Sequence, residues 1–174
     1  MRELARELGV SAMTPYRYFK DKNSILAAVR ANAFNDFAAA LEQAACVRGN
    51  AAERADAVGQ AYLHFAFAKP HAYKLMFDFN QPDDGRFPEL ERAALRARRT
   101  MTGYMEALVK GGFLAGDPDI LGQVFWATVH GLVVLHLAGK LKPTPDFDTV
   151  HRTAMRLLAR GAQAISQPEK RRAS

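Results

Sequence analysis

The chain has 174 residues, of which 49% are apolar and 24% are charged, as in an ordinary soluble globular protein. This composition excludes a disordered acidic or basic tail protein and provides enough apolar residues for a sizeable core. Lys and Arg number 24 against 18 for Asp and Glu, a formal net charge of +6 that permits a polyanionic partner. The single cysteine, Cys46, excludes an intrachain disulfide and a cysteine-based zinc cluster, and favours a reducing compartment.

The N-terminus and the longest apolar run both bear on localisation. Residues 1–7 carry charges where a signal peptide has its apolar stretch. The run from Val124 to Ala138 has 15 residues and includes His130 and His136, which makes it short and polar for a bilayer span. The sequence therefore predicts a cytoplasmic protein with no membrane partner.

Helical periodicity dominates the chain, and no strand-length stretch alternates with a period of two. Clusters of Gly, Pro, Asn and Asp separate the segments of helical length. We expect Ser11, Ser24 and Asp117 to be N-caps and Gly111 to be a C-cap. The predicted helices cover residues 1–8, 12–19, 24–46, 51–69, 70–77, 88–111, 118–140 and 146–166. The fold class is therefore predicted as all-α.

The first two helices are short and meet at the turn Gly9-Val10-Ser11. Two short helices joined by a glycine turn are typical of a helix-turn-helix, in which the second helix enters the major groove of DNA. The second segment supplies hydroxyl groups and cations that suit phosphate oxygens and base edges. The simplest alternative is an ordinary helical hairpin whose aromatic side chains belong to the core.

The string Leu-Ala-Arg-Glu-Leu-Gly-Val-Ser-Ala-Met-Thr-Pro-Tyr-Arg-Tyr-Phe-Lys-Asp-Lys-Asn-Ser-Ile-Leu over residues 4–26 resembles the tetracycline-repressor (TetR) family of transcriptional regulators. The resemblance implies that Thr14 and Arg17 contact bases, that Tyr16 and Lys22 contact phosphates, and that Tyr18 does either. The full set of DNA-binding residues that it suggests is Ala12, Met13, Thr14, Tyr16, Arg17, Tyr18 and Lys22. It also implies a further helix before residue 1, so the head formed by residues 1–37 is expected to be incomplete at its N-terminus.

Two residues depart from the family pattern inside the second helix. Met13 replaces a common small residue, and Pro15 replaces a common Leu. Pro15 removes one backbone N–H from the first turn, where a proline costs less than in a helix interior.

The segment 38–166 is predicted to be a helical effector-binding and dimerisation domain, followed by a disordered basic tail over 167–174. Its aromatic and Met residues are dense enough to form adaptable apolar walls, and pockets in bundles lie between facing helices. The resemblance implies an apolar or amphipathic small-molecule effector. Core filling is the alternative role for the candidate effector-binding residues Tyr62, Phe65, Tyr73, Phe77, Met101, Tyr104, Trp126 and His130.

Trp126 and His130 are four residues apart, so they share a helix face, and Gly131 permits the close approach of another helix. This Trp-x-x-x-His-Gly pattern resembles the Trp-His-Gly (WHG) subtype of effector domain in the family. His130 is a candidate donor to an effector oxygen and a candidate group for titration near neutral pH. A satisfied core or interface histidine is the alternative.

The helices 118–140 and 146–166 carry more apolar surface than one small domain covers. In the TetR family the last two helices of each subunit form a four-helix bundle across a two-fold axis, so the resemblance implies a homodimer through 118–140 and 146–166. A dimer also suits a palindromic site in double-stranded DNA.

Enzymatic function is not expected. The five histidines lack metal-ligand spacing, and the chain has no nucleophile elbow, phosphate loop or dinucleotide fingerprint. We expect no cofactor and no metal site. The sequence predicts a ligand-responsive repressor that leaves a palindromic operator when an apolar molecule binds. The alternatives are a helical small-molecule-binding protein without DNA binding and a regulator of another helix-turn-helix family.

Overall fold

The computed structural model describes Arg6, Gly9, Ser11 and residues 13–78 and 84–165. Over these residues it contains helices and no strand, which confirms the all-α prediction. The elements are η1 (Pro15–Arg17), α2 (Lys22–Ala45), α3 (Ala51–Ala68), α4 (Pro70–Met76), η2 (Asp84–Arg86), α5 (Pro88–Thr102), α6 (Tyr104–Lys110), α7 (Pro118–Leu137) and α8 (Phe147–Ile165). Of the expected helix 1–8 only Arg6 is described, in helical conformation, and the tail 167–174 lies outside the described residues.

Local side-chain chemistry sets where several helices begin. Asp117 caps α7 as predicted, accepting from the backbone N–H of Asp119 at 2.8 Å and of Ile120 at 3.2 Å. The prediction of Ser24 as an N-cap is wrong. Asp21 caps α2 instead, because its carboxylate reaches the backbone N–H of Ser24 at 2.8 Å and so satisfies an orphan donor of the first turn.

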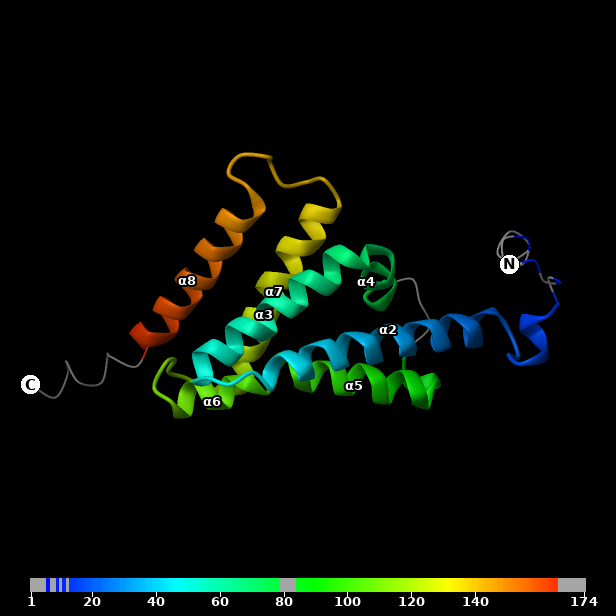
Figure 1. Ribbon diagram of the computed structural model, residues 1–174, viewed down its shortest axis with the longest axis horizontal. Coiled ribbons are helices and arrows are strands. Elements are labelled where there is room, and N and C mark those ends of the chain that lie inside the picture. The colour runs from blue at the N-terminus through cyan, green and yellow to red at the C-terminus, as the bar shows by residue number, and fades with distance from the viewer. Residues whose placement is uncertain (1–5, 7–8, 10, 12, 79–83, 166–174) are drawn as a thin grey trace, which may run out of the picture.

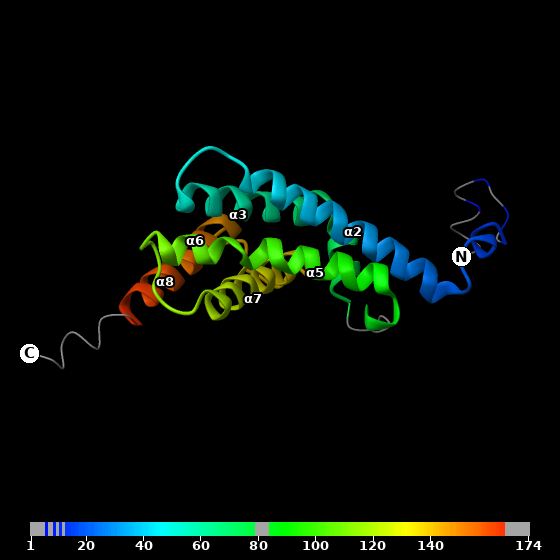
Figure 2. The ribbon, with the colours of Figure 1, turned by 90° about the horizontal axis from the view of Figure 1, so that it is seen from below.

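The long helix α2 runs beside α5 on one side and α3 on the other, while α7 and α8 form an antiparallel hairpin at the opposite side of the body (Figures 1 and 2). The N-terminal end of α2 extends beyond the other helices, and η1 lies past that end. The helix continues without a break through residue 37, the predicted boundary between head and body.

The core lies where α2, α3, α4, α5 and α7 meet. Phe37 of α2 is fully buried and makes edge-to-face contacts with Tyr62 at 5.2 Å and Phe65 at 5.1 Å between ring centroids. The largest completely buried side chains are Tyr73, Phe37, Leu41, Met76, Leu90, Met105 and Val133.

The single helix predicted over 88–111 is wrong, because the chain breaks at Gly103 into α5 and α6. The Gly103 N–H still donates to the Arg99 carbonyl at 2.8 Å, and a Cβ at Gly103 would lie 2.7 Å from that oxygen. Glycine is therefore needed at this bend. After it, α6 packs on α3 and α7. The end of α5 also packs closely on α7. A Cβ added at Gly122 of α7 would lie only 2.8 Å from the Cβ of Thr102, the last residue of α5.

Candidate functional site

The segment predicted to read DNA is not an α-helix. Its backbone bonds run from residue i to residue i−3, with Thr14 donating to Ser11 at 2.9 Å, Tyr16 to Met13 at 3.1 Å and Arg17 to Thr14 at 3.2 Å. Only Pro15–Arg17 forms a helix, of the 3-10 type, so the predicted α-helix over 12–19 is wrong. Pro15 supplies the reason, because it has no N–H to donate and turns the preceding residue away from the α-helical region.

The side chains of this segment nevertheless point into solvent. Tyr18 is 81% exposed and Met13 is 67% exposed, while Tyr16 and Arg17 are also exposed. Thr14 is half-buried, and Ala12 lies outside the described residues.

Four exposed cations are described at this end of the molecule: Arg6, Arg17, Lys20 and Lys22. Lys22 is the first residue of α2. The one described carboxylate among them, Asp21, is engaged by Ser24, whose backbone N–H holds the pKa of Asp21 below its usual value. The local charge is therefore positive, which suits a polyanion.

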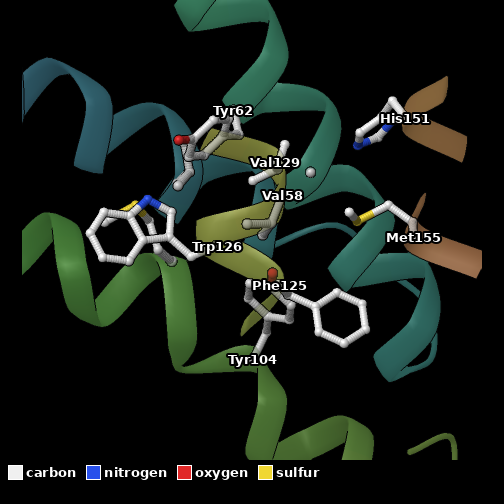
Figure 3. Close-up of a pocket in the computed structure, with 11 residues that line it drawn as sticks. Val58, Tyr62, Tyr104, Phe125, Trp126, Val129, His151 and Met155 are labelled. Atoms are coloured by element: carbon white, nitrogen blue, oxygen red, sulfur yellow. The ribbon is translucent and has the colours of Figure 1, made fainter. Parts of the chain in front are cut away.

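The eight predicted effector-binding residues do not line one cavity. Tyr62, Met101, Tyr104 and Trp126 line a hollow of about 50 Å³ between α2, α3, α5, α6, α7 and α8. Figure 3 shows Trp126 at one side of it and His151 and Met155 of α8 at the other, with Val58 and Val129 between them. A space of this size has room for a few water molecules and is too small for an effector.

Tyr73, Phe77 and His130 line a second cavity, of about 460 Å³, between α4 and α7. Its volume falls in the range of small-molecule sites. Phe65 lines neither cavity, since it is 5% exposed and packs against Phe37 in the core. The remaining wall of the larger cavity consists of Pro70, His71, Lys74, Asp78, Val134, Leu137 and Ala138.

Sequence reasoning missed these seven residues, although helical spacing held a signal for most of them. Pro70 lies three residues before Tyr73, and Lys74 lies three residues before Phe77, the residue that follows α4, so each pair is close along the helix. Val134, Leu137 and Ala138 follow His130 at four, seven and eight residues, along one face of α7.

Two tyrosines and His130 form a hydrogen-bonded chain between the two cavities. The hydroxyl oxygens of Tyr62 and Tyr73 are 2.5 Å apart, and Tyr73 Oη lies 2.7 Å from His130 Nδ1. Burial raises the pKa of Tyr62 to about 12 and raises that of Tyr73 further, so both keep their protons at neutral pH. Burial lowers the pKa of His130, which favours its neutral form.

An apolar face of α7 and α8 is open to solvent. Ile120, Val124 and Leu135 lie on one side of α7 and are 61%, 42% and 44% exposed, and Leu157 of α8 is 64% exposed. Gly131 lies on the same side, and a Cβ added there would meet nothing within 4 Å. Large apolar side chains gathered in this way mark an interaction surface.

The helix α7 has 20 residues, longer than the 15-residue run marked in the sequence, and is long and apolar enough to cross a membrane by length and composition. One such helix is weak evidence for a membrane span, because packed helices of soluble proteins pass the same test. Within the described part of the chain, no three His, Cys, Asp or Glu side chains gather in a way that would hold a metal ion.

Comparison with known proteins matches two family models. Residues 1–29 match the model of bacterial regulatory proteins of the tetR family, and residues 55–160 match the tetracyclin repressor-like C-terminal domain. A comparison with curated protein sequences gave no significant match. The WHG subtype suggested by Trp126, His130 and Gly131 stays a prediction.

Two solved structures share the fold. A protein of unknown function from Rhodococcus sp. RHA1 has 30% identity and a TM-score of 0.77, over 93% of this chain and 84% of that one. A candidate regulatory protein, SCO4313, has 20% identity and a TM-score of 0.67, over 90% of this chain and 82% of that one. The second likeness supports the fold alone. With the C-terminal family model covering more than half of its residues, the chain belongs to the TetR family of bacterial transcriptional regulators.

Proposed function

We propose that the protein is a cytoplasmic, homodimeric repressor that binds a palindromic operator and leaves it when an apolar or amphipathic small molecule occupies the cavity between α4 and α7. The observation that carries this proposal is the position of α4. Tyr73 of α4 and Phe77, which follows it, line the cavity. The last residue of α4, Met76, accepts a hydrogen bond of 3.2 Å from Arg30 of α2. The helix α2 leads directly to the cationic N-terminal end.

A ligand that displaces α4 acts on α2 through this contact. Arg30 is only 5% exposed and lies among the core residues Ala27, Ala31 and Phe34. Its guanidinium group therefore cannot exchange the Met76 carbonyl for bulk water when α4 moves. In a dimer, tilting the two α2 helices changes the distance between the two heads. A palindromic site requires a fixed distance of about one helical turn of DNA, so the tilted form binds it less well. A coupling of about 1–3 kcal/mol suffices for regulation.

The dimer is proposed to form through the exposed face of α7 and α8. Ile120, Val124, Gly131 and Leu135 form an apolar row on α7, and Leu157 is exposed on the neighbouring helix α8. We propose that these residues together form the interface. Two copies that cover this surface remove its large side chains from water, at about 25 cal/mol per Å² of apolar area. Gly131, which has no side chain, allows the α7 helices of the two copies to approach closely.

The residues proposed to contact DNA are Met13, Thr14, Tyr16, Arg17, Tyr18 and Lys22, together with Ala12 outside the described residues. A footprint of the protein on the DNA that flanks its own gene tests this function. We expect protection of one inverted repeat, with loss of protection in Arg17→Ala.

The second candidate is a helical ligand carrier that does not bind DNA. It is favoured by the 3-10 conformation of Pro15–Arg17, which presents base-reading side chains on one short turn instead of a helix of several turns. The same footprint separates the two functions. A carrier leaves every position of the flanking DNA unprotected while it still binds ligand.

A further inference from the structure

Four polar groups follow one another from the small cavity to the large one: the indole of Trp126, the hydroxyls of Tyr62 and Tyr73, and the imidazole of His130. Tyr62 and Tyr73 are 4% and 1% exposed, so both side chains are shielded from bulk solvent. Trp126 Nε1 is buried, and its geometry toward the Tyr62 hydroxyl falls short of a hydrogen bond, yet it lies near enough to help lower the pKa of Tyr62. Figure 3 shows the Trp126 and Tyr62 side chains at the same end of the small cavity.

The protons in this chain can run in only one direction without a conflict. An indole N–H donates and never accepts, and each tyrosine has one proton to donate. If Nδ1–H of His130 donated to Tyr73, then Tyr73 would donate to Tyr62, and the Tyr62 proton would need another acceptor. The described residues offer Tyr62 no other hydrogen-bond partner, and the nearby Trp126 N–H is itself a donor.

In the opposite direction, each tyrosine hydroxyl proton has an acceptor. Tyr62 donates to Tyr73, and Tyr73 donates to His130 Nδ1. The Tyr62 oxygen then keeps its lone pairs toward the Trp126 N–H. With Nδ1 as an acceptor, neutral His130 carries its proton on Nε2. The low pKa of His130 and the high pKa of both tyrosines agree with this neutral state.

Nε2 is the ring nitrogen of His130 that remains available to a ligand in the larger cavity. His130 lines that cavity, its Nδ1 is taken by Tyr73, and its Nε2 has no hydrogen-bond partner among the described residues and is not enclosed. The surrounding wall is apolar at Phe77, Val134 and Leu137. Lys74 and Asp78 bring opposite charges that cancel in sum.

We propose that the chain Tyr62–Tyr73–His130 fixes His130 as a neutral hydrogen-bond donor, and that the cavity therefore selects uncharged ligands that combine an apolar body with a carbonyl oxygen. This inference rests on the proposed function only for the regulatory effect of the ligand. His130 contacts the ligand, whereas Tyr73 and Tyr62 are positioning residues that act through its tautomer.

The tautomer is measured on the unaltered chain by nitrogen-15 NMR of the His130 ring. We expect an unprotonated Nδ1 and a protonated Nε2 at neutral pH. Tyr73→Phe removes the proton that Nδ1 accepts and should give a mixture of both tautomers. Tyr104→Phe is the matched control, because Tyr104 lines the small cavity but not the larger one, and the change should leave the tautomer unchanged. A protonated Nδ1 in the unaltered chain overturns the proposal.

Ligand selection is measured with three probes that share one skeleton: butyrophenone, butylbenzene and 4-phenylbutyrate. Trp126 is the single tryptophan, and its ring centroid lies 6.2 Å from that of Phe77 and 6.1 Å from that of His130, so its fluorescence reports occupancy. Butyrophenone should bind about two- to tenfold more tightly than butylbenzene, the value of one neutral hydrogen bond. In His130→Phe this ratio should fall to about one.

Three results contradict the inference: tightest binding of 4-phenylbutyrate, a ratio of one in the unaltered chain, and a ratio that persists in His130→Phe. The probes are titrated without DNA, so failure here differs from failure of the proposed function. A chain that prefers butyrophenone but protects no DNA refutes the regulator and keeps the ligand class. A chain that binds its operator but does not prefer butyrophenone refutes the ligand class and keeps the regulator.

Discussion

Arg30 of α2 donates from Nη2 to the carbonyl oxygen of Met76, the last residue of α4, across 3.2 Å and 46 positions of sequence. The bond is buried, and it joins the helix that carries the head to the short helix that lines the larger cavity. It is a direct connection between the two regions that the proposed regulation couples.

Replacing Arg30 by Met should therefore uncouple ligand from DNA. The carbonyl of Met76 loses its partner in a buried place, so the free energy of unfolding should fall by about 1–3 kcal/mol. Ligand affinity should stay near its original value, while the effect of ligand on DNA affinity shrinks. Arg96→Met is the control, because it breaks an exposed ion pair, that of Arg96 with Glu42 between α2 and α5, and exposed pairs contribute little to stability. A full ligand response in Arg30→Met would refute this role.

Dimerisation is tested at Leu157. Leu157→Glu places a charge in the proposed interface and should cost several kcal/mol of association, at least about 2. Sedimentation equilibrium should then show monomers. Leu95→Glu changes a leucine of similar type on α5, 44% exposed and away from α7 and α8, and should leave the dimer intact. Equal association constants for the two variants would place the interface elsewhere.

Arg17 and Lys22 should differ in how they contribute to DNA binding. Arg17→Ala should cost about 1–3 kcal/mol at one operator position and relax the preference for its base. Lys22→Ala should weaken binding to all duplexes about equally and reduce the slope of log affinity against log salt by about one. Binding isotherms at several salt concentrations measure both. An unaltered slope in Lys22→Ala would remove this residue from the phosphate contacts.

Two half-buried histidines should make stability depend on pH. Burial lowers the pKa of His130 and of His151 below the usual 6.5. Between the lowered and the usual pKa the unfolded chain binds more protons than the folded chain. The contribution of these two histidines to the free energy of unfolding is therefore fully present above about pH 6.5 and is lost as the pH falls through their lowered pKa values.

Thermal unfolding between about pH 7.5 and pH 5 measures this dependence. The melting temperature should decrease toward low pH, and the decrease should be smaller in His130→Gln and in His151→Gln. A slope that is the same in the original protein and in both variants would assign the pH dependence to other groups.

Most helices were predictable because their limits depend on local chemistry. Asp117 followed by Pro118 begins α7 as expected, and the apolar periodicity placed α3 and α4 within one residue at each end. The break at Gly103 was not predictable in the same way. It depends on how α6 turns to reach α3 and α7, which is a property of packing and not of the local sequence.

The candidate site was predictable only as a set of residues. The sequence marked Tyr62, Tyr73 and His130, but their distribution between two cavities follows from the crossing of α3, α4 and α7. Periodicity shows which face of a helix is apolar, and it cannot show which two faces leave a space between them. The 3-10 turn at Pro15 shows the reverse case, in which one residue overrides a helical pattern that its neighbours suggest.

The most direct test is a fluorescence anisotropy titration of the footprinted duplex, with and without butyrophenone at a concentration that saturates the Trp126 signal. We expect two chains to bind per inverted repeat and the ligand to lower the affinity for that duplex about 5- to 150-fold. A scrambled duplex should bind weakly in both conditions. Equal affinity for the footprinted duplex with the cavity empty and with the cavity saturated would contradict the account of a ligand-released repressor.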